Sequence, residues 1–187
     1  MTSGKKIKDA LKDACKRVGA VDAHALLKNV LSCDEIYLAL HKDDEIKTES
    51  AEKFENFVLQ REKSKPVAYI TNFKEFMGLS FYVDENVLIP RQDTEILVEE
   101  VIKILQMFDK KYLRSDIERE NNNTQIFGDK KDTRELKVLD MCTGSGSIAI
   151  SIAKYVKESI IDAVDISKKA LDIVQKNAKN NGVIECV

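Results

Sequence analysis

Apolar residues in the N-terminal part of the chain recur at helical spacing. Gly19 follows the first such segment, and Asp22, Asp34 and Thr48 are placed to cap three further helices. The pattern therefore predicts a small helical bundle over residues 1–64. The positions that define its first helix lie three and four residues apart: Ile7, Ala10, Leu11, Ala14, Cys15 and Val18.

The period changes after Pro66, which interrupts the helical pattern. Residues 75–77 and 80–83 are rich in aromatic and aliphatic side chains and flank Gly78, which predicts a β-hairpin. The chain then stays extended as far as Pro90, because a proline disfavours helix at the residue before it. We predict that residues 65–90 form a linker built around this hairpin.

A second helical pattern begins at Asp93 or Thr94, and either residue can cap the helix. The stretch that follows, residues 109–134, is charged, contains consecutive asparagines and has no apolar period. We predict a flexible insertion there. The inward positions of the helix before it are predicted to be Leu97, Val98, Val101, Ile102 and Leu105.

A strand, a glycine turn and a helix come next. Residues 136–140 are a short apolar run, and residues 147–156 repeat apolar positions at helical spacing. Between them, Gly144 and Gly146 allow the backbone to turn tightly and to approach a ligand. A turn of this kind, at the carboxyl end of a strand, is where open α/β sheets bind their ligands.

The same alternation continues to the end of the sequence. Residues 159–165 predict a second strand, and residues 168–180 predict a helix with Ser167 as its N-cap and Gly182 as its stop. Residues 184–187 predict the beginning of a third strand. Alternating strands and helices indicate an α/β fold with a parallel sheet.

The glycine turn matches a nucleotide-binding pattern. Gly144-x-Gly146-x-x-Ala149 fits the dinucleotide fingerprint, and Asp165 follows the second glycine by 165 − 146 = 19 positions. Asp140, however, lies at the mouth of the turn, where its charge would repel a pyrophosphate. S-adenosylmethionine has no phosphate and carries an ammonium and a sulfonium, so the acid favours this cofactor. A nicotinamide cofactor and a turn without a ligand are the alternatives.

Composition narrows the class of function without deciding it. Hydrophobic residues make up 43% of the 187 residues, and 30 basic residues against 32 acidic ones give a net charge of −2. The overall charge therefore attracts neither nucleic acid nor an anionic membrane. No apolar run reaches membrane-spanning length and the first residues are charged, so we expect a cytoplasmic protein.

The cysteines and histidines argue against a metal centre. The four cysteines are far apart in sequence, and the two histidines, His24 and His41, fall in or beside the predicted bundle helices. We predict neither a zinc site nor disulfides. Cys142 lies in the glycine turn, where we expect a small residue that packs beneath a cofactor rather than a nucleophile.

Four segments, in this order, resemble one family of enzymes. They are Lys-Pro-Val-Ala-Tyr-Ile at 65–70, Glu-Phe-Met-Gly-Leu-Ser-Phe at 75–81, Val-Leu-Ile-Pro-Arg-Gln-Asp-Thr-Glu at 87–95 and Val-Leu-Asp-Met-Cys-Thr-Gly-Ser-Gly at 138–146. Together they resemble the PrmC/HemK family of protein-(glutamine-N5) methyltransferases, which modify peptide chain release factors. The resemblance implies a helical domain that recognises the substrate, followed by a class I, Rossmann-like methyltransferase domain that begins at residue 91.

The resemblance also implies S-adenosylmethionine as the cofactor and assigns residues to it. Asp165 would bind the ribose, and Asp140 would flank the methionine end. The turn residues that match the cofactor motif are Cys142, Thr143, Gly144, Ser145 and Gly146. A second segment would help to wall the site through Pro90, Arg91, Asp93, Thr94 and Glu95.

The implied substrate is the glutamine of a Gly-Gly-Gln loop in a release factor, held in part by the helical bundle. The family also carries an Asn-Pro-Pro-Tyr motif that orients the amide nitrogen for methyl transfer. The only prolines in this chain are Pro66 and Pro90, so the motif is absent and no catalytic residue is assigned. We therefore expect residues 1–187 to be inactive alone.

Three other functions stay open at this point. An N6-adenine methyltransferase also modifies a planar NH₂ group, although the charge of this chain gives no strong nucleic-acid signal. A nicotinamide-dependent oxidoreductase would use the same glycine pattern. A non-catalytic binding module would use the helical bundle alone.

Overall fold

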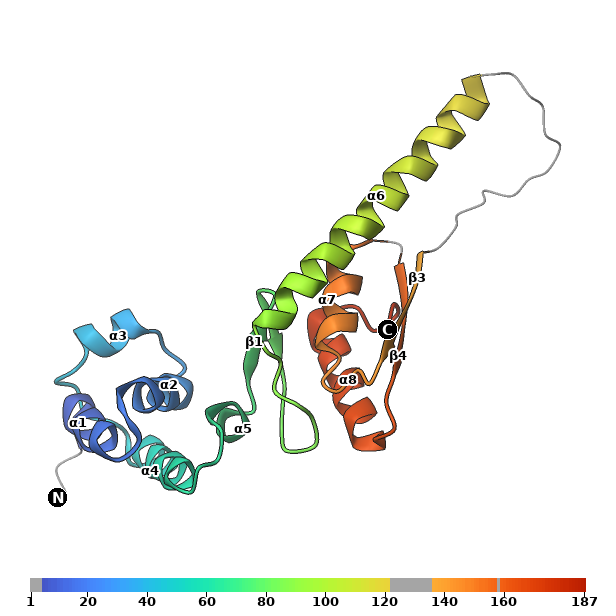
Figure 1. The fold of residues 1–187 in the computed structure, drawn as a ribbon. Helices are drawn as coiled ribbons and strands as arrows, with labels where there is room; N and C mark the ends of the chain where they lie inside the picture. Colours follow the sequence, from blue (N-terminus) through green and yellow to red (C-terminus); the bar gives the residue numbers. More distant parts are fainter. Residues whose placement is uncertain (1–4, 122–135, 158) are drawn as a thin grey trace. The chain divides into compact units, whose positions relative to one another are not determined.

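The computed structural model describes residues 5–121, 136–157 and 159–187, and the chain divides into two compact units (Figure 1). The first unit is Met1–Asn72 and the second is Phe73–Val187. The predicted fold class, a helical bundle followed by a β-hairpin and the beginning of a Rossmann-like domain, is confirmed.

The first unit is a bundle of short helices. Their apolar faces meet in one core, in which Leu26, Leu27 and Val58 are fully buried. The helices are α1 (Ile7–Val18), α2 (Ala20–Leu31), α3 (Glu35–Leu40), α4 (Thr48–Glu62) and α5 (Val67–Thr71).

The helical unit extends beyond the limit that the sequence predicted. Pro66 precedes α5 with a φ of −57°, which suits the position just before a helix, and Ile70 of α5 is buried in the bundle core. The sequence analysis assigned this segment to the hairpin linker because so short a helix shows no complete apolar period.

Two of the predicted helix caps are wrong. Gly19, with a φ of 85°, both ends α1 and precedes α2, so Asp22 lies in the first turn of α2 instead of capping it. Thr48 is the first residue of α4 rather than its cap. The third cap is confirmed, because the Asp34 carboxylate accepts a hydrogen bond from the Tyr37 N–H at 2.8 Å.

The second unit opens with the predicted β-hairpin. β1 (Lys74–Phe76) and β2 (Leu79–Phe81) pair in antiparallel fashion. The two residues that link them have φ values of 52° and 67°, the double left-handed conformation of a type I′ turn. The rings of Phe76 and Phe81 are buried and lie edge to face, with centroids 6.2 Å apart.

The next helix, α6 (Asp93–Asn121), is longer than predicted. Val98 is fully buried as expected, whereas Leu97, predicted to face inward, is 57% exposed. The flexible insertion is wrong for residues 109–121, which continue the helix; strongly charged sequences of Lys, Arg and Glu have good helix propensity without an apolar face. The remainder of the predicted insertion, residues 122–134, lies outside the described residues.

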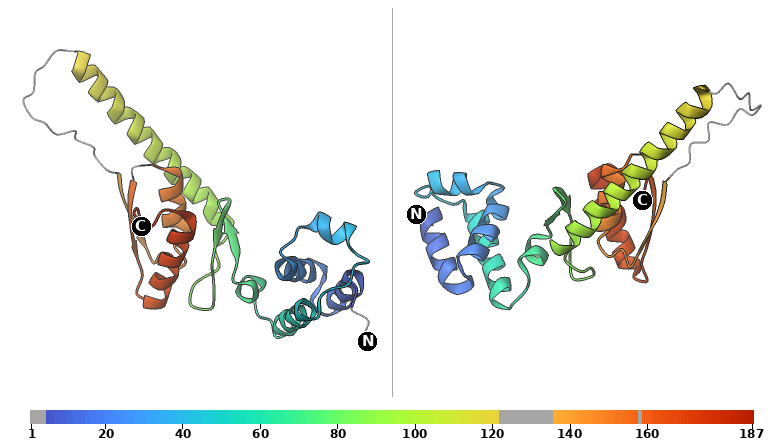
Figure 2. Two further views of the ribbon diagram at one scale, coloured as in Figure 1. Left: turned by 180° about the vertical axis from the view of Figure 1, so that it is seen from behind. Right: turned by 45° about the horizontal axis from the view of Figure 1, so that its top comes forward.

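The beginning of the Rossmann-like domain consists of two parallel strands and two helices. β3 (Leu136–Met141) pairs with β4 (Ser159–Val164) along their full length. Figures 1 and 2 show α7 (Ser147–Tyr155) and α8 (Lys168–Asn181) on the same side of this pair. The opposite side of the pair carries no helix from the described part of the chain.

Both predicted ends of α8 are confirmed. The Ser167 side chain accepts a hydrogen bond from the Ala170 N–H, and Gly182 ends the helix in the left-handed conformation. The third strand predicted from residue 184 is wrong, because residues 184–186 form a turn that a backbone hydrogen bond closes at 3.0 Å.

Candidate cofactor-binding site

The glycine loop, residues 142–146, connects β3 to α7 through repeated left-handed residues. Cys142, Gly144 and Gly146 have φ values of 63°, 58° and 77°. Glycine adopts this region freely, whereas a side chain there costs about 1–2 kcal/mol. The loop can therefore turn sharply from the end of the strand into the first turn of the helix.

Asp140 supplies the cap that α7 would otherwise lack. Gly146 precedes the helix and has no side chain to accept hydrogen bonds from its first turn. The Asp140 Oδ2 atom accepts one bond from the Ala149 N–H at 3.3 Å and another from the Thr143 hydroxyl at 2.7 Å. One buried carboxylate thus fixes both the loop and the helix. Burial raises the pKa of Asp140 above its ordinary value, although the two hydrogen bonds oppose this effect.

Asp165 holds the same loop from the neighbouring strand. It follows β4, and its two carboxylate oxygens accept hydrogen bonds from the Ser167 N–H and the Gly144 N–H, each at 2.9 Å. These backbone bonds lower the pKa of Asp165 below its ordinary value. Asp165 is therefore in direct contact with the glycine loop. In the sequence, only their spacing related the two.

Several backbone N–H groups of this turn are already paired within the protein. The N–H groups of Gly144 and Ala149 donate to the two carboxylates, and the Gly146 N–H donates to the Thr143 carbonyl at 2.9 Å. A pyrophosphate at a helix N-terminus depends on N–H groups of this kind. The two carboxylates would also repel it, so the geometry favours a ligand that carries positive charge and hydroxyl groups.

The two loop glycines differ in their surroundings. A Cβ on Gly146 would lie 2.9 Å from Ile150 Cδ1 and 3.1 Å from Val174 Cγ1, so this position is closed by packing. A Cβ on Gly144 would meet nothing closer than the Cys142 carbonyl oxygen at 4.0 Å. Gly146 therefore anchors the loop to the helices, and Gly144 faces open space.

The other loop residues divide into buried and exposed positions. Thr143 and Ser145 are buried, and the Thr143 N–H donates to the Val164 carbonyl at 3.0 Å, which ties the loop to β4. Cys142 is exposed and does not pack into the protein. Its predicted place beneath a cofactor stays a prediction.

The predicted second wall of the site, residues 90–95, is bonded to the hairpin in the described residues. The Glu95 Oε1 atom accepts a hydrogen bond from the Met77 N–H at 2.8 Å. Among the described side-chain hydrogen bonds, this segment contacts the hairpin turn and not the glycine loop. Its role at a cofactor stays a prediction. Its other members differ in exposure: buried Pro90, half-buried Thr94, and exposed Arg91 and Asp93.

Asn177 touches the glycine loop and was missed in the sequence analysis. It is fully buried on α8, and its Nδ2 atom donates to the Ser145 carbonyl at 2.9 Å and to the Tyr82 carbonyl at 3.0 Å. A signal was present, because a polar residue on the buried face of a helix needs a partner. The apolar stripe that it interrupts consists of Ala170, Ile173, Val174 and Ala178.

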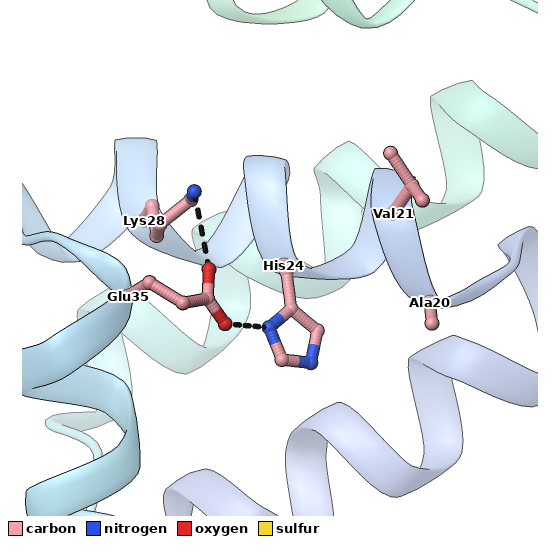
Figure 3. A pocket seen from close by; sticks show the side chains of 5 residues that line it. All are labelled: Ala20, Val21, His24, Lys28 and Glu35. Carbon is pink, nitrogen blue, oxygen red and sulfur yellow. Dashed lines mark hydrogen bonds and ion pairs between the residues drawn. The ribbon is translucent and has the colours of Figure 1, made fainter.

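A pocket in the first unit does not offer comparable chemistry (Figure 3). Glu35 accepts from His24 Nδ1 at 2.5 Å and from Lys28 Nζ at 3.1 Å, and these two partners lower the pKa of Glu35. The charged groups that line the pocket are therefore paired with one another, and Val21 on its wall is 84% exposed.

Comparison with known proteins identifies both units. Residues 5–71 match the PrmC N-terminal domain, and residues 121–187 match the methyltransferase small domain. A release factor glutamine methyltransferase of Clostridium acetobutylicum is 37% identical over 179 residues, which cover 92% of this chain and 54% of that protein. The chain is thus similar to the PrmC family over both units. Its α/β unit is therefore the beginning of a methyltransferase domain.

Two further relatives agree with this similarity. A release factor glutamine methyltransferase of Leptospira interrogans is 35% identical over 178 residues, covering 95% of this chain and 54% of that protein. A bifunctional methyltransferase of Rickettsia conorii is 34% identical over 182 residues, covering 92% of this chain and 34% of that protein. The chain thus spans about half the length, or less, of the curated relatives it matches.

The described residues meet the requirements neither for a membrane-spanning helix nor for a metal site. None of their helices has the length and apolar character needed to cross a membrane. Across the same residues, His, Cys, Asp and Glu form no cluster suited to hold a metal ion.

The different surroundings of the glycines predict different effects of alanine. Gly146→Ala should lower the free energy of unfolding of the second unit by about 2–4 kcal/mol, because left-handed strain adds to overpacking. Gly144→Ala should cost only about 1 kcal/mol, the strain alone. Urea unfolding, followed through the amide signals of α7, measures both. Equal losses in the two variants would contradict the packing role of Gly146.

Two substitutions of Asp140 should change the stability of the second unit in opposite directions. Asp140→Ala leaves Ala149 and Thr143 without their acceptor and should destabilise the second unit by about 1–3 kcal/mol. Asp140→Asn keeps an acceptor oxygen and removes a buried charge, so it should stabilise this unit at neutral pH.

The pH dependence follows from the direction of the pKa shift. The pKa of Asp140 is higher in the folded than in the unfolded state, so the ionised carboxyl opposes folding above the folded pKa. The advantage of Asp140→Asn should therefore shrink as the pH falls and Asp140 becomes protonated in both states. A constant advantage between neutral and acid pH, measured by urea unfolding, would contradict this account.

Proposed function

We propose that the chain is the N-terminal portion of an S-adenosylmethionine-dependent protein methyltransferase that modifies the side-chain amide of glutamine in a peptide chain release factor. In this proposal the helical unit recognises the substrate, and residues 73–187 begin the cofactor-binding domain. The names of the relatives suggest the substrate, and the geometry of the glycine loop supports the cofactor.

The pairing of the loop N–H groups is the observation that carries the choice of cofactor. The N–H groups of Gly144 and Ala149 already bind the carboxylates of Asp165 and Asp140, so they are not free for phosphate. Two carboxylates beside one loop produce a negative potential, which attracts an ammonium and a sulfonium. S-adenosylmethionine carries both charges and supplies, when bound, a methyl group on its sulfonium.

The residues of this chain take distinct roles in the proposed site. Asp165 is ionised at neutral pH and accepts hydrogen bonds from ribose hydroxyls in addition to its backbone partners. Asp140 shapes the loop and adds negative charge near the methionine end. Gly144 has no side chain on the open side of the loop, so a ligand can approach its backbone closely. Thr143 and Ser145 hold the loop from within.

The reaction itself needs groups beyond these. An amide nitrogen is a poor nucleophile because its lone pair is delocalised into the carbonyl, so it must be oriented in line with the methyl group. In the resembling family, an Asn-Pro-Pro-Tyr motif performs this task, and this chain contains no such sequence. Residues 1–187 thus supply cofactor binding and substrate recognition.

Binding measurements on this chain test the proposal against its rivals. Calorimetric titration should show saturable binding of S-adenosylmethionine and no binding of NADH; the reverse result would favour an oxidoreductase. A purified release factor should bind, and a DNA duplex should not. Binding of DNA alone would favour an adenine methyltransferase, and binding of a release factor without any cofactor would favour a non-catalytic module.

A chimera tests the substrate directly. Residues 1–187 are followed by the remaining C-terminal part of the Clostridium acetobutylicum relative, and the product receives labelled S-adenosylmethionine and a release factor. The label should appear on glutamine of the release factor. A folded chimera that binds cofactor and labels no protein would contradict the proposed substrate.

Asp165→Ala should weaken binding of S-adenosylmethionine by about 2–3 kcal/mol, the scale of hydrogen bonds to a charged group. Cys142→Ala is the matched control in the same loop and should bind the cofactor as the unmodified chain does. Calorimetry measures both variants. An unchanged dissociation constant for Asp165→Ala would remove this residue from the site, and loss of methyl transfer in a chimera with Cys142→Ala, despite intact binding, would make Cys142 a nucleophile.

Residues 1–187 alone should transfer no methyl group to a release factor, because effective-molarity effects of about 7–11 kcal/mol depend on placement of the nucleophile.

The exposed face of the two-stranded sheet predicts fast hydrogen exchange in its strands. Leu139, Met141 and Val164 are 59%, 65% and 45% exposed, although parallel sheets normally have both faces covered. Hydrogen exchange should be faster in β3 and β4 than in the bundle helices. Slow exchange throughout residues 136–187 of a monomer, or robust methyl transfer, would overturn these expectations.

A further inference from the structure

Asn177 joins two parts of the second unit that are distant in sequence. Its Oδ1 atom accepts a hydrogen bond from the Tyr82 N–H at 2.8 Å, and its Nδ2 atom donates to the Tyr82 carbonyl at 3.0 Å. The amide thus pairs with the Tyr82 backbone as a neighbouring strand would. Its second Nδ2 bond, to the Ser145 carbonyl at 2.9 Å, reaches into the glycine loop.

The hairpin is fastened to the helices at other points as well. The Asn181 Nδ2 atom, one turn further along α8, donates to the Ser80 carbonyl at 3.0 Å. The Tyr155 hydroxyl of α7 donates to the Met77 carbonyl at the hairpin turn at 2.7 Å. Neither of these two side chains bonds to the glycine loop in the described contacts, so Asn177 alone among them links the hairpin to the loop.

We infer that Asn177 is a positioning residue that couples the docked hairpin to the conformation of the cofactor-binding loop. This inference rests on the proposed function, because it takes S-adenosylmethionine as the ligand of the loop. Asn177 does not touch the ligand in this account. It acts through Ser145, whose carbonyl it holds directly before Gly146, the residue that precedes α7.

The cost of losing this amide explains why it can act as a coupler. The Tyr82 N–H, the Tyr82 carbonyl and the Ser145 carbonyl all meet Asn177, which is 0% exposed. The bond to the Ser145 carbonyl is buried and the two bonds to Tyr82 are part-buried, so removal of the amide should perturb the loop and the hairpin together. A shift of the loop moves Gly144, whose N–H is held by Asp165.

The test compares two asparagines of one helix. Asn177→Ala should weaken binding of S-adenosylmethionine by tenfold or more in calorimetry, whereas Asn181→Ala, which loosens the same hairpin without touching the loop, should weaken it only about two- to threefold. Equal weakening in both variants would show that hairpin stability alone matters. Unchanged binding in Asn177→Ala would also overturn the inference.

Tyr155→Phe keeps the inference testable if Asn177→Ala fails to fold. It removes one hydroxyl from a side chain that is 43% exposed, so the fold should persist. Loosening the hairpin turn should weaken cofactor binding about two- to threefold, and the loss should be less than additive with Asn177→Ala when both variants fold. Full affinity in Tyr155→Phe, with a hairpin that exchanges its amides faster, would overturn the coupling.

Hydrogen exchange separates failure of this inference from failure of the proposed function. Asn177→Ala should accelerate exchange in both the hairpin, residues 74–83, and the loop, residues 142–150. Asn181→Ala should accelerate it in the hairpin far more than in the loop. This result without any ligand supports the coupling even if the unmodified chain binds no S-adenosylmethionine, in which case only the proposed cofactor is wrong. Unchanged exchange in the loop of Asn177→Ala overturns the coupling.

Discussion

A buried carboxylate at the end of β3 determines how the methyltransferase unit begins. Gly146 precedes α7 with a φ of 77°, and a Cβ there would crowd the side chains of Ile150 and Val174. A glycine cannot cap a helix through its side chain. Asp140, on β3, instead accepts a hydrogen bond from the Ala149 N–H in the first turn of α7. This arrangement places a carboxylate in the protein interior. The tight loop, the start of the helix and the negative potential beside the loop all follow from this one arrangement.

A second carboxylate holds the same loop. Asp165 approaches from β4 and binds the Gly144 N–H, so the loop is held between two acids on adjacent parallel strands. Three backbone N–H groups of this turn, those of Gly144, Gly146 and Ala149, bind protein oxygens instead of being free for a phosphate. The two neighbouring acids are therefore the basis on which we propose a cationic ligand for a motif that, in sequence, resembles a general nucleotide signature. The hairpin adds a further constraint on the loop through Asn177.

The sequence predicted those features that depend on local chemistry. Ser167, Gly182 and the paired glycines marked the ends of helices and the turn because capping and left-handed backbone depend on one residue and its neighbours. The extent of α6 was missed because a charged helix shows no apolar period. The apolar stripe of α8 marks Asn177 as a polar residue on a buried face, but no local pattern identifies its partner Tyr82, which lies 95 positions away in the sequence. The role of Asp140 as a cap was likewise invisible, since Asp140 and Ala149 lie on different elements.

The central claim is that the loop between the two carboxylates binds the methyl donor. An NMR titration of the ¹⁵N-labelled chain with S-adenosylhomocysteine, the demethylated product, tests it at the level of single residues. The account predicts saturable shifts of the Gly144 and Gly146 amide signals together with those of residues 165–167, while the signals of the helical unit stay in place. Shifts confined to the helical unit, or shifts of the loop signals with NADH and none with S-adenosylhomocysteine, would contradict the account.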